Sequence, residues 1–186
     1  MQELERFRSR IDSLDEVLIS LLSERFLKTR LIGSAKVSNG LRVEDLAREE
    51  ELRSRVLTLS EGKLEAEFLD GFMTQIFEHE KSEQEGCMGA AHSHLSIDSL
   101  RSKIEALDRE ITENLVERFC VTREVGHFKA QNNLNAVDPD RERKQLGRAT
   151  LLAARHGLNS TLVEALLKLV RGRVVQEHER IARTYR

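Results

Sequence analysis

The chain carries one pattern of charged residues twice. The first copy is Arg8, Arg25, Lys36, Asp45, Arg48 and Glu49, and the second is Arg101, Arg118, Lys129, Asp138, Arg141 and Glu142, at identical internal spacing. Matching apolar residues would follow from any pair of amphipathic helices, but surface charges drift freely unless something requires them. The pattern therefore indicates a duplicated ligand site in which cations converge on one small ligand.

Helix geometry divides these cations between two pockets. Arg25 and Lys36 are eleven residues apart, so on one helix they lie within about 20° of each other and roughly 16 Å apart along the axis. Arg8 lies about 100° around the same helix and roughly 25 Å from Arg25, too far to serve that pocket. We therefore predict a reciprocal arrangement, in which Arg101 completes the first copy's site and Arg8 completes the second's.

Three helices are expected in each copy. Apolar residues recur at three- and four-residue steps from Leu4 to Ile32, without Gly or Pro, which predicts one long helix. The stretch VSNGLRVED ends it, and Asp45 is placed to cap a second helix. In the second copy Asp138 followed by Pro139 is the same start signal in stronger form. A third helix is predicted from near Leu64 to Gln84, with its counterpart starting near Asn159.

Polar residues continue the apolar face of the first copy's third helix. Glu80 and Gln84 follow Met73, Ile76 and Phe77 in phase, and polar groups on a buried face need partners. One interpretation is a frayed, solvated helix end. The other is that Gln84 lines the same pocket as Arg25.

Composition narrows the class of protein. One-third of the 186 residues are charged, with one Pro and ten Gly, which indicates long helices and an all-α fold. Because 30 Lys and Arg face 32 Asp and Glu, the chain has no overall basic field, and we expect neither nucleic acid nor a membrane as partner. The charged N-terminus and the lack of a long apolar run predict a cytoplasmic protein.

A short linker separates the two copies. The segment from about Glu85 to His94 contains small residues and two Gly, so we expect repeat 1 over 1–84, the linker over 85–94 and repeat 2 over 95–186. His92 and His94 lie in it without acidic or Cys ligands nearby, and no metal site is expected. Two cysteines, Cys87 and Cys120, are too few for a disulfide framework and are expected to be free thiols.

The ordered set of motifs resembles the all-helical, AroQ-type chorismate mutase family. The first copy shows FRSRIDSLD, LLSERF, IGSAK, VEDLARE and EHEKSEQ, and the second shows LRSKIEALD, VERF, VGHFK, VDPDRE and VVQEHE. No single string is specific, but their order and spacing are, and they cover nearly the whole chain twice. The resemblance implies two tandem three-helix chorismate mutase type II repeats, packed as an intertwined pseudo-dimeric helical bundle.

That resemblance also implies a reaction and roles for the site residues. The reaction is the Claisen rearrangement of chorismate to prephenate in the shikimate pathway, without metal or cofactor, driven by positioning and electrostatic stabilisation of the breaking ether oxygen. The implied roles are as follows: Lys36 and Gln84 donate to the ether oxygen, Arg25 and Arg101 clamp the substrate carboxylates, Glu49 engages the ring hydroxyl, and Asp45 and Arg48 shape the ring side. A planar guanidinium suits a carboxylate in a way that Lys does not.

Both copies depart from the family pattern in the third helix. In the second copy Val174 stands opposite Glu80 and His178 opposite Gln84. Because His178 can still donate one hydrogen bond, a weakened or altered site and a dead site both remain open. In the first copy Glu80 replaces a small hydroxyl residue and would repel a dianionic substrate. Either Glu80 turns to a local cation, or the substrate carries a positive group.

Several functions fit these residues. Chorismate mutase leads, with one good site that includes Glu80 and a second, impaired site formed by Arg8, Arg118, Lys129, Asp138, Arg141, Glu142 and His178. Alternatives are 4-amino-4-deoxychorismate mutase, isochorismate pyruvate lyase, and a non-catalytic chorismate- or prephenate-binding regulatory protein. The linker spans about 18 Å on average, so an intrachain pseudo-dimer and a domain-swapped homodimer both remain open.

Overall fold

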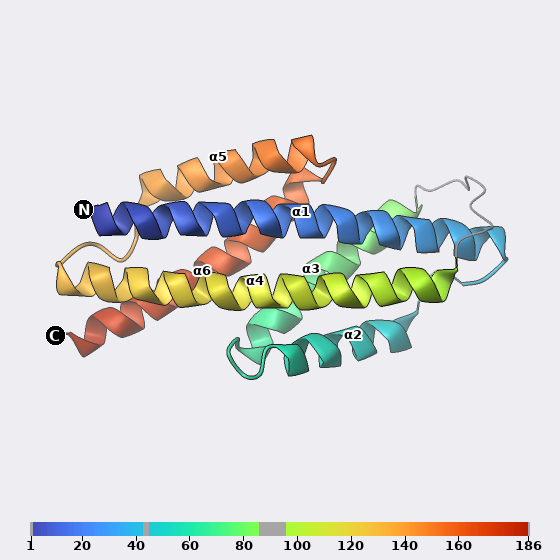
Figure 1. Cartoon of the computed structure of the whole chain (residues 1–186), viewed down its shortest axis with the longest axis horizontal. Helices are drawn as coiled ribbons and strands as arrows, with labels where there is room; N and C mark the ends of the chain where they lie inside the picture. The colour runs from blue at the N-terminus through green and yellow to red at the C-terminus, as the bar shows by residue number, and fades with distance from the viewer. Residues whose placement is uncertain (1, 43–44, 86–95, 186) are drawn as a thin grey trace. The chain divides into compact units, whose positions relative to one another are not determined.

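A computed structural model describes residues 2–42, 45–85 and 96–185, excluding the side chains of residues 84 and 85, and these segments form six α-helices. In chain order the helices are α1 (Gln2–Ser38), α2 (Leu46–Leu59), α3 (Ala66–Glu85), α4 (Ile97–Gln131), α5 (Pro139–Arg155) and α6 (Ser160–Thr184) (Figure 1). The described residues contain no strand. The prediction of an all-α fold with three helices in each repeat is confirmed.

The predicted helix starts are confirmed at the level of hydrogen bonds. Asp45 caps α2 by accepting a hydrogen bond from the Arg48 amide, and Asp138 caps α5 by accepting one from the Arg141 amide. Such a cap satisfies a backbone donor that has no partner within the helix. Asn159 caps α6 in the same way. Asp45 and Asp138 thus each fix the start of the helix that carries the next two charged residues of the repeated pattern, an Arg and a Glu.

The structure divides into two compact units, and each contains segments of both repeats. Unit 1 is Met1–Ile19 with Asn114–Arg186, and unit 2 is Ser20–Glu113. Unit 1 therefore combines the first half of α1 with the second half of α4, α5 and α6, whereas unit 2 combines the remaining halves with α2 and α3. The intertwining of two tandem repeats follows from this exchange of half-helices within one chain.

Apolar side chains from α1 and α4 meet in the core of each unit. In unit 1, Leu4, Ile11 and Leu14 pack with Val121 and Val125. Ile32, Leu100 and Ile104 form the corresponding cluster in unit 2. These clusters hold the two long helices together at the level where each repeat supplies its cations.

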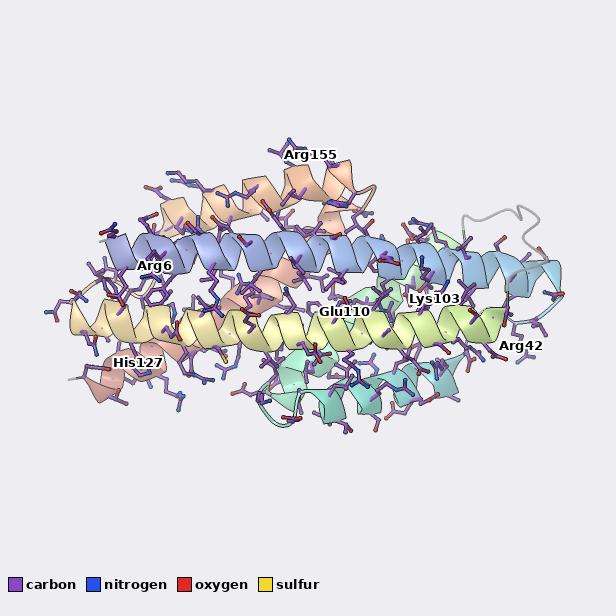
Figure 2. All side chains as sticks on the ribbon, viewed as in Figure 1. Arg6, Arg42, Lys103, Glu110, His127 and Arg155 are labelled. Carbon is purple, nitrogen blue, oxygen red and sulfur yellow. The ribbon has the colours of Figure 1, made fainter. Side chains whose placement is uncertain are left out.

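Charged side chains cover the outer faces of the helices. Figure 2 labels six exposed charged or His side chains from α1, α4, α5 and the segment that follows α1: Arg6, Arg42, Lys103, Glu110, His127 and Arg155. Among the described helices, none has a stretch that is both long and apolar enough to cross a bilayer.

Part of the predicted linker lies outside the described residues. This applies to Cys87, His92 and His94, so the predictions made for them remain predictions. Cys120 in α4 is exposed and free, as expected.

Candidate active site

One cavity in unit 2 brings together five of the six charged residues of the first copy, all except Arg8, and Arg101 of the second. It has a volume of about 410 Å³. Its charged lining consists of Arg25, Lys36, Asp45, Arg48, Glu49, Glu80, Lys81 and Arg101. Arg101 comes from α4, while Arg25 and Lys36 come from α1. This is the reciprocal placement of Arg101 that helix geometry predicts. The side chain of Gln84 lies outside the described part of the chain.

Arg25 is the most deeply buried cation of this cavity and is held by two carboxylates. It is 1% exposed, its Nε donates to Asp108 Oδ1 at 2.7 Å, and its Nη1 donates to Glu80. Thr29 Oγ1 donates to the same Glu80 oxygen at 2.8 Å. Burial lowers the pKa of Arg25, but Asp108 and Glu80 outweigh it and the pKa is raised overall. Glu80 therefore pairs with Arg25, which lines the same cavity.

Three other cations of the unit 2 cavity, Arg101, Lys36 and Lys81, face carboxylates that also line it. Asp45 Oδ2 lies 3.0 Å from Arg101 Nη2 and 3.7 Å from Lys36 Nζ. Glu49 lies 3.3 Å from Lys81 Nζ. Asp45 thus links the start of α2 to both α1 and α4, and it places two cations beside each other at one end of the cavity.

Arg48 joins α2 to α4. Its guanidinium donates to Glu105 at 2.6 Å and to Glu51 at 2.5 Å, and Arg55 also pairs with Glu105. Hydrogen bonds from Arg48 and Arg55 lower the pKa of Glu105. With Glu51 and Glu105 both engaged, Arg48 is held in place in the wall of the cavity.

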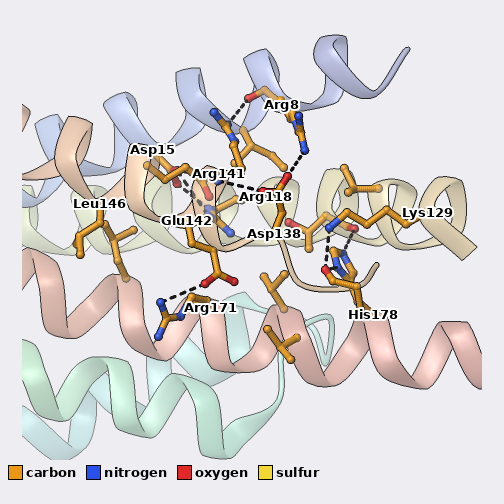
Figure 3. Close-up of a pocket in the computed structure, with 18 of the residues that line it drawn as sticks. Arg8, Asp15, Arg118, Lys129, Asp138, Arg141, Glu142, Leu146, Arg171 and His178 are labelled. Atoms are coloured by element: carbon orange, nitrogen blue, oxygen red, sulfur yellow. Dashed lines mark hydrogen bonds and ion pairs between the residues drawn. The ribbon is translucent and has the colours of Figure 1, made fainter. Parts of the chain in front are cut away.

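A second cavity, in unit 1, has the corresponding lining. It has a volume of about 130 Å³ and is lined by all seven residues expected for a second site, Arg8, Arg118, Lys129, Asp138, Arg141, Glu142 and His178, together with Val174 (Figure 3). Arg8 comes from α1 and Arg118 and Lys129 come from α4, so the exchange of half-helices is repeated.

Arg118 occupies the place that Arg25 has in unit 2. Its Nε donates to Asp15 Oδ1 at 2.6 Å, and its Nη2 lies 3.5 Å from Asp15 Oδ2. The Nη1 atom is buried and has no hydrogen-bond partner among the described residues. Val174 stands where α3 has Glu80, which is why this nitrogen lacks the carboxylate that Arg25 has.

Lys129 and Asp138 both line the unit 1 cavity. Lys129 Nζ donates to the Ala136 carbonyl at 2.7 Å. Burial lowers the pKa of Lys129, and the charge of Arg8 acts in the same direction. The Arg141 amide lowers the pKa of Asp138, and Arg8, which donates to Asp138 at 2.5 Å, adds to this. The carboxylate is therefore firmly ionised.

His178 is turned toward the backbone. Its Nε2 lies 2.8 Å from the Thr122 carbonyl and its Nδ1 lies 3.4 Å from the Ala136 carbonyl. Burial lowers its pKa from the ordinary value of 6.5, with the charge of Lys129 acting in the same direction. In the neutral tautomer protonated at Nε2, the single N–H donates to the Thr122 carbonyl, which is the nearer of the two. A Cβ at Gly126 would lie 2.7 Å from the ring, so this Gly makes room for His178.

Comparison with known proteins identifies the fold family. Residues 7–85 and 100–179 each match the family described as Chorismate mutase type II. The chain belongs to this family. Similarity to curated proteins is partial: 73 residues are 33% identical to the T-protein of Haemophilus influenzae, and 72 residues are 29% identical to the bifunctional chorismate mutase/prephenate dehydratase of Buchnera aphidicola subsp. Baizongia pistaciae.

Each match covers 39% of this chain and 19% of the relative, so the chain spans about one-fifth of the length of the curated relatives it matches. No solved structure matches the chain significantly. Within the described residues, no group of His, Cys, Asp and Glu side chains has a metal-binding arrangement.

Sequence reasoning missed the two carboxylates that anchor the central Arg of each chorismate mutase type II site. These are Asp108 for Arg25 and Asp15 for Arg118. A signal was present, because each Asp follows the first Arg of its copy, Arg101 or Arg8, by the same interval within an apolar stripe. Lys81 and Arg171, which pair with Glu49 and Glu142 respectively, were also missed, because they do not occupy equivalent positions on the third helices.

Proposed function

We propose that this chain converts chorismate to prephenate and that the unit 2 cavity is the main site of the reaction. The observation that carries the proposal is the convergence of Arg25, Lys36 and Arg101 from two repeats on one cavity large enough for a small dicarboxylate. Cationic donors fixed in place before the substrate arrives are what an electrostatic rearrangement requires. The cytoplasmic location predicted from the sequence is part of this proposal.

In the proposed reaction the ether C–O bond breaks while a C–C bond forms within the same molecule, with no proton transfer and no cofactor. Arg101 and Arg25 bind the two substrate carboxylates, and Lys36 and Gln84 donate to the ether oxygen as negative charge develops on it. Glu49 accepts a hydrogen bond from the ring hydroxyl. Arg48 and Asp45, which are fixed by Glu105 and by the α2 cap, position the ring.

Glu80 bears on the choice of substrate. Its charge is compensated by Arg25 and by the Thr29 hydroxyl, which supports a dianionic substrate without a positive group. The substrate carboxylate must then either bind Arg25 together with Glu80 or displace Glu80 from it. The proposal consequently favours chorismate over 4-amino-4-deoxychorismate.

The test is turnover of chorismate by wild-type protein, Lys36→Ala and the matched variant Lys129→Ala, with product identified as prephenate. Loss of one preorganised donor typically costs about 10²- to 10³-fold in kcat. We expect a loss of this size in Lys36→Ala and little change in Lys129→Ala, with unchanged circular dichroism in both. Folded wild-type protein that leaves chorismate intact would refute the proposal, and a dominant loss in Lys129→Ala would transfer the activity to unit 1.

A further inference from the structure

The unit 1 cavity contains a buried cationic donor that nothing in the described chain uses. Arg118 is 5% exposed, and Asp15 binds the Nε side of its guanidinium. Nη1 is buried without a partner among the described residues, and Figure 3 shows the guanidinium in the midst of the lining residues. A buried donor left unsatisfied destabilises the folded state, and a charged donor does so more strongly, so it calls for an acceptor. A carboxylate is the acceptor that a guanidinium fits best.

The acids around Arg118 are already engaged. Asp15 binds Arg118 itself, Asp138 binds Arg8, and Glu142 lies 3.3 Å from Arg171. Each of these lining carboxylates already pairs with a cation of the protein, so a ligand ammonium group would have to compete for it. The cavity therefore selects against amino acids and for an acid that carries no positive charge.

Apolar side chains form much of the rest of the unit 1 lining. Ile11, Val125, Leu146, Val174 and Val175 face the cavity. Two of these, Val174 and Val175, stand where α3 of unit 2 has Glu80 and Lys81, so the third helix of unit 1 has lost both charges of that pair. An apolar body fits against these side chains, and the small volume of about 130 Å³ limits its size.

The same cavity offers few donors for a rearrangement. Both ring nitrogens of His178 lie against backbone carbonyls, Nε2 at 2.8 Å from Thr122 and Nδ1 at 3.4 Å from Ala136. Of the two donors that the family pattern places at the ether oxygen, Lys129 is the one that remains. Anion binding and rearrangement are therefore separable in unit 1. Arg118 can bind an anion, whereas a rearrangement would lack one of the two donors to the ether oxygen.

We propose that the unit 1 cavity is a binding site for a small apolar monocarboxylate, which it holds through Arg118 Nη1 without transforming it. Binding does not depend on chorismate turnover. The proposal is therefore independent of the activity assigned to unit 2, and either can fail without the other.

The test is isothermal titration calorimetry of the full chain with benzoate, at low ionic strength, with benzamide as the uncharged probe of the same shape. We expect benzoate to bind one site per chain and benzamide to bind at least tenfold more weakly. The decisive variant is Val174→Glu, which copies the Glu80–Arg25 pairing that the fold already accommodates in unit 2. It should occupy Arg118 Nη1 and weaken benzoate at least tenfold.

Leu151→Glu is the matched control. It adds the same charge on α5 of unit 1 at a side chain that is 65% exposed, and we expect benzoate affinity within twofold of wild type. Arg118→Gln should abolish binding, and circular dichroism reports whether it folds. Wild-type protein that does not bind benzoate, or equal affinity in Val174→Glu and wild type, would overturn the proposal.

Discussion

In both units a buried Arg on one long helix is anchored at Nε by an Asp on the other, through Arg25 and Asp108 in unit 2 and Arg118 and Asp15 in unit 1. The units differ on the third helix. In unit 2 the Nη1 atom of Arg25 donates to Glu80. In unit 1 Val174 stands at the position of Glu80, and the Nη1 atom of Arg118 has no hydrogen-bond partner among the described residues. The long helices thus supply a common anion site. In unit 2 a ligand carboxylate has to compete with Glu80 for it, whereas in unit 1 no described side chain occupies the corresponding nitrogen.

The largest expected effect tests the two anchors against each other. Asp15→Ala leaves Arg118 buried without any carboxylate among the described residues, and breaking such a buried pair typically costs about 3–5 kcal/mol. Asp108→Ala should cost less, because Glu80 still compensates Arg25. Urea unfolding of the two variants measures the difference, and equal losses would show that Glu80 contributes nothing to the burial of Arg25.

A second prediction tests whether His178 limits unit 1. In a Lys36→Ala background, which removes a donor from the unit 2 site, His178→Gln restores an amide donor at the position of Gln84. We expect residual chorismate turnover to rise about tenfold, less than the 10²- to 10³-fold value of a fully preorganised donor. His178→Leu is the control, and a rise in that variant would assign the effect to cavity size instead.

A change of similar size, now in KM, is expected when Glu80, the competitor of the substrate for Arg25, is removed from unit 2. Glu80→Val gives Arg25 the environment of Arg118, so a substrate carboxylate no longer shares the guanidinium. We expect KM for chorismate to fall roughly tenfold, which corresponds to about 1.4 kcal/mol, while kcat changes less. Steady-state kinetics at fixed ionic strength measures it; an increase in KM would mean that Glu80 orients Arg25 instead of competing for it.

The smallest effect is a pH dependence of stability. Because burial lowers the pKa of His178 below its ordinary value of 6.5, the unfolded chain binds the proton more readily. The folded state therefore loses stability as pH falls from 6.5 toward the lowered pKa, and gains nothing further above 6.5. His178→Gln removes this component, so its urea midpoint should fall less than that of wild type between pH 7.5 and 5.5. Parallel shifts in both proteins would exclude the ring as the cause.

Much of the site could be predicted from residue spacing alone. Helical periodicity places Arg25 and Lys36 on one face and excludes Arg8 from it, and both cavities follow that division. Spacing along the chain predicts these positions because rise and rotation per residue are fixed along a regular helix. Partner choice within a cavity was harder to predict. The sequence left open whether Glu80 turns to a local cation or the substrate carries a positive group, and in the structure Glu80 pairs with Arg25 of the same cavity.

The sequence by itself determined the helices, their caps and the double set of cations, because periodicity and capping act within one turn or along one axis. Only the tertiary structure decided which atoms those cations meet: Asp15 and Asp108 at the two Arg, the Thr122 carbonyl at His178, and Val174 beside Arg118. These contacts join different helices, and the packing of one helix against another sets them, since hydrogen bonds and ion pairs depend on distances of a few ångström that no spacing along the chain specifies.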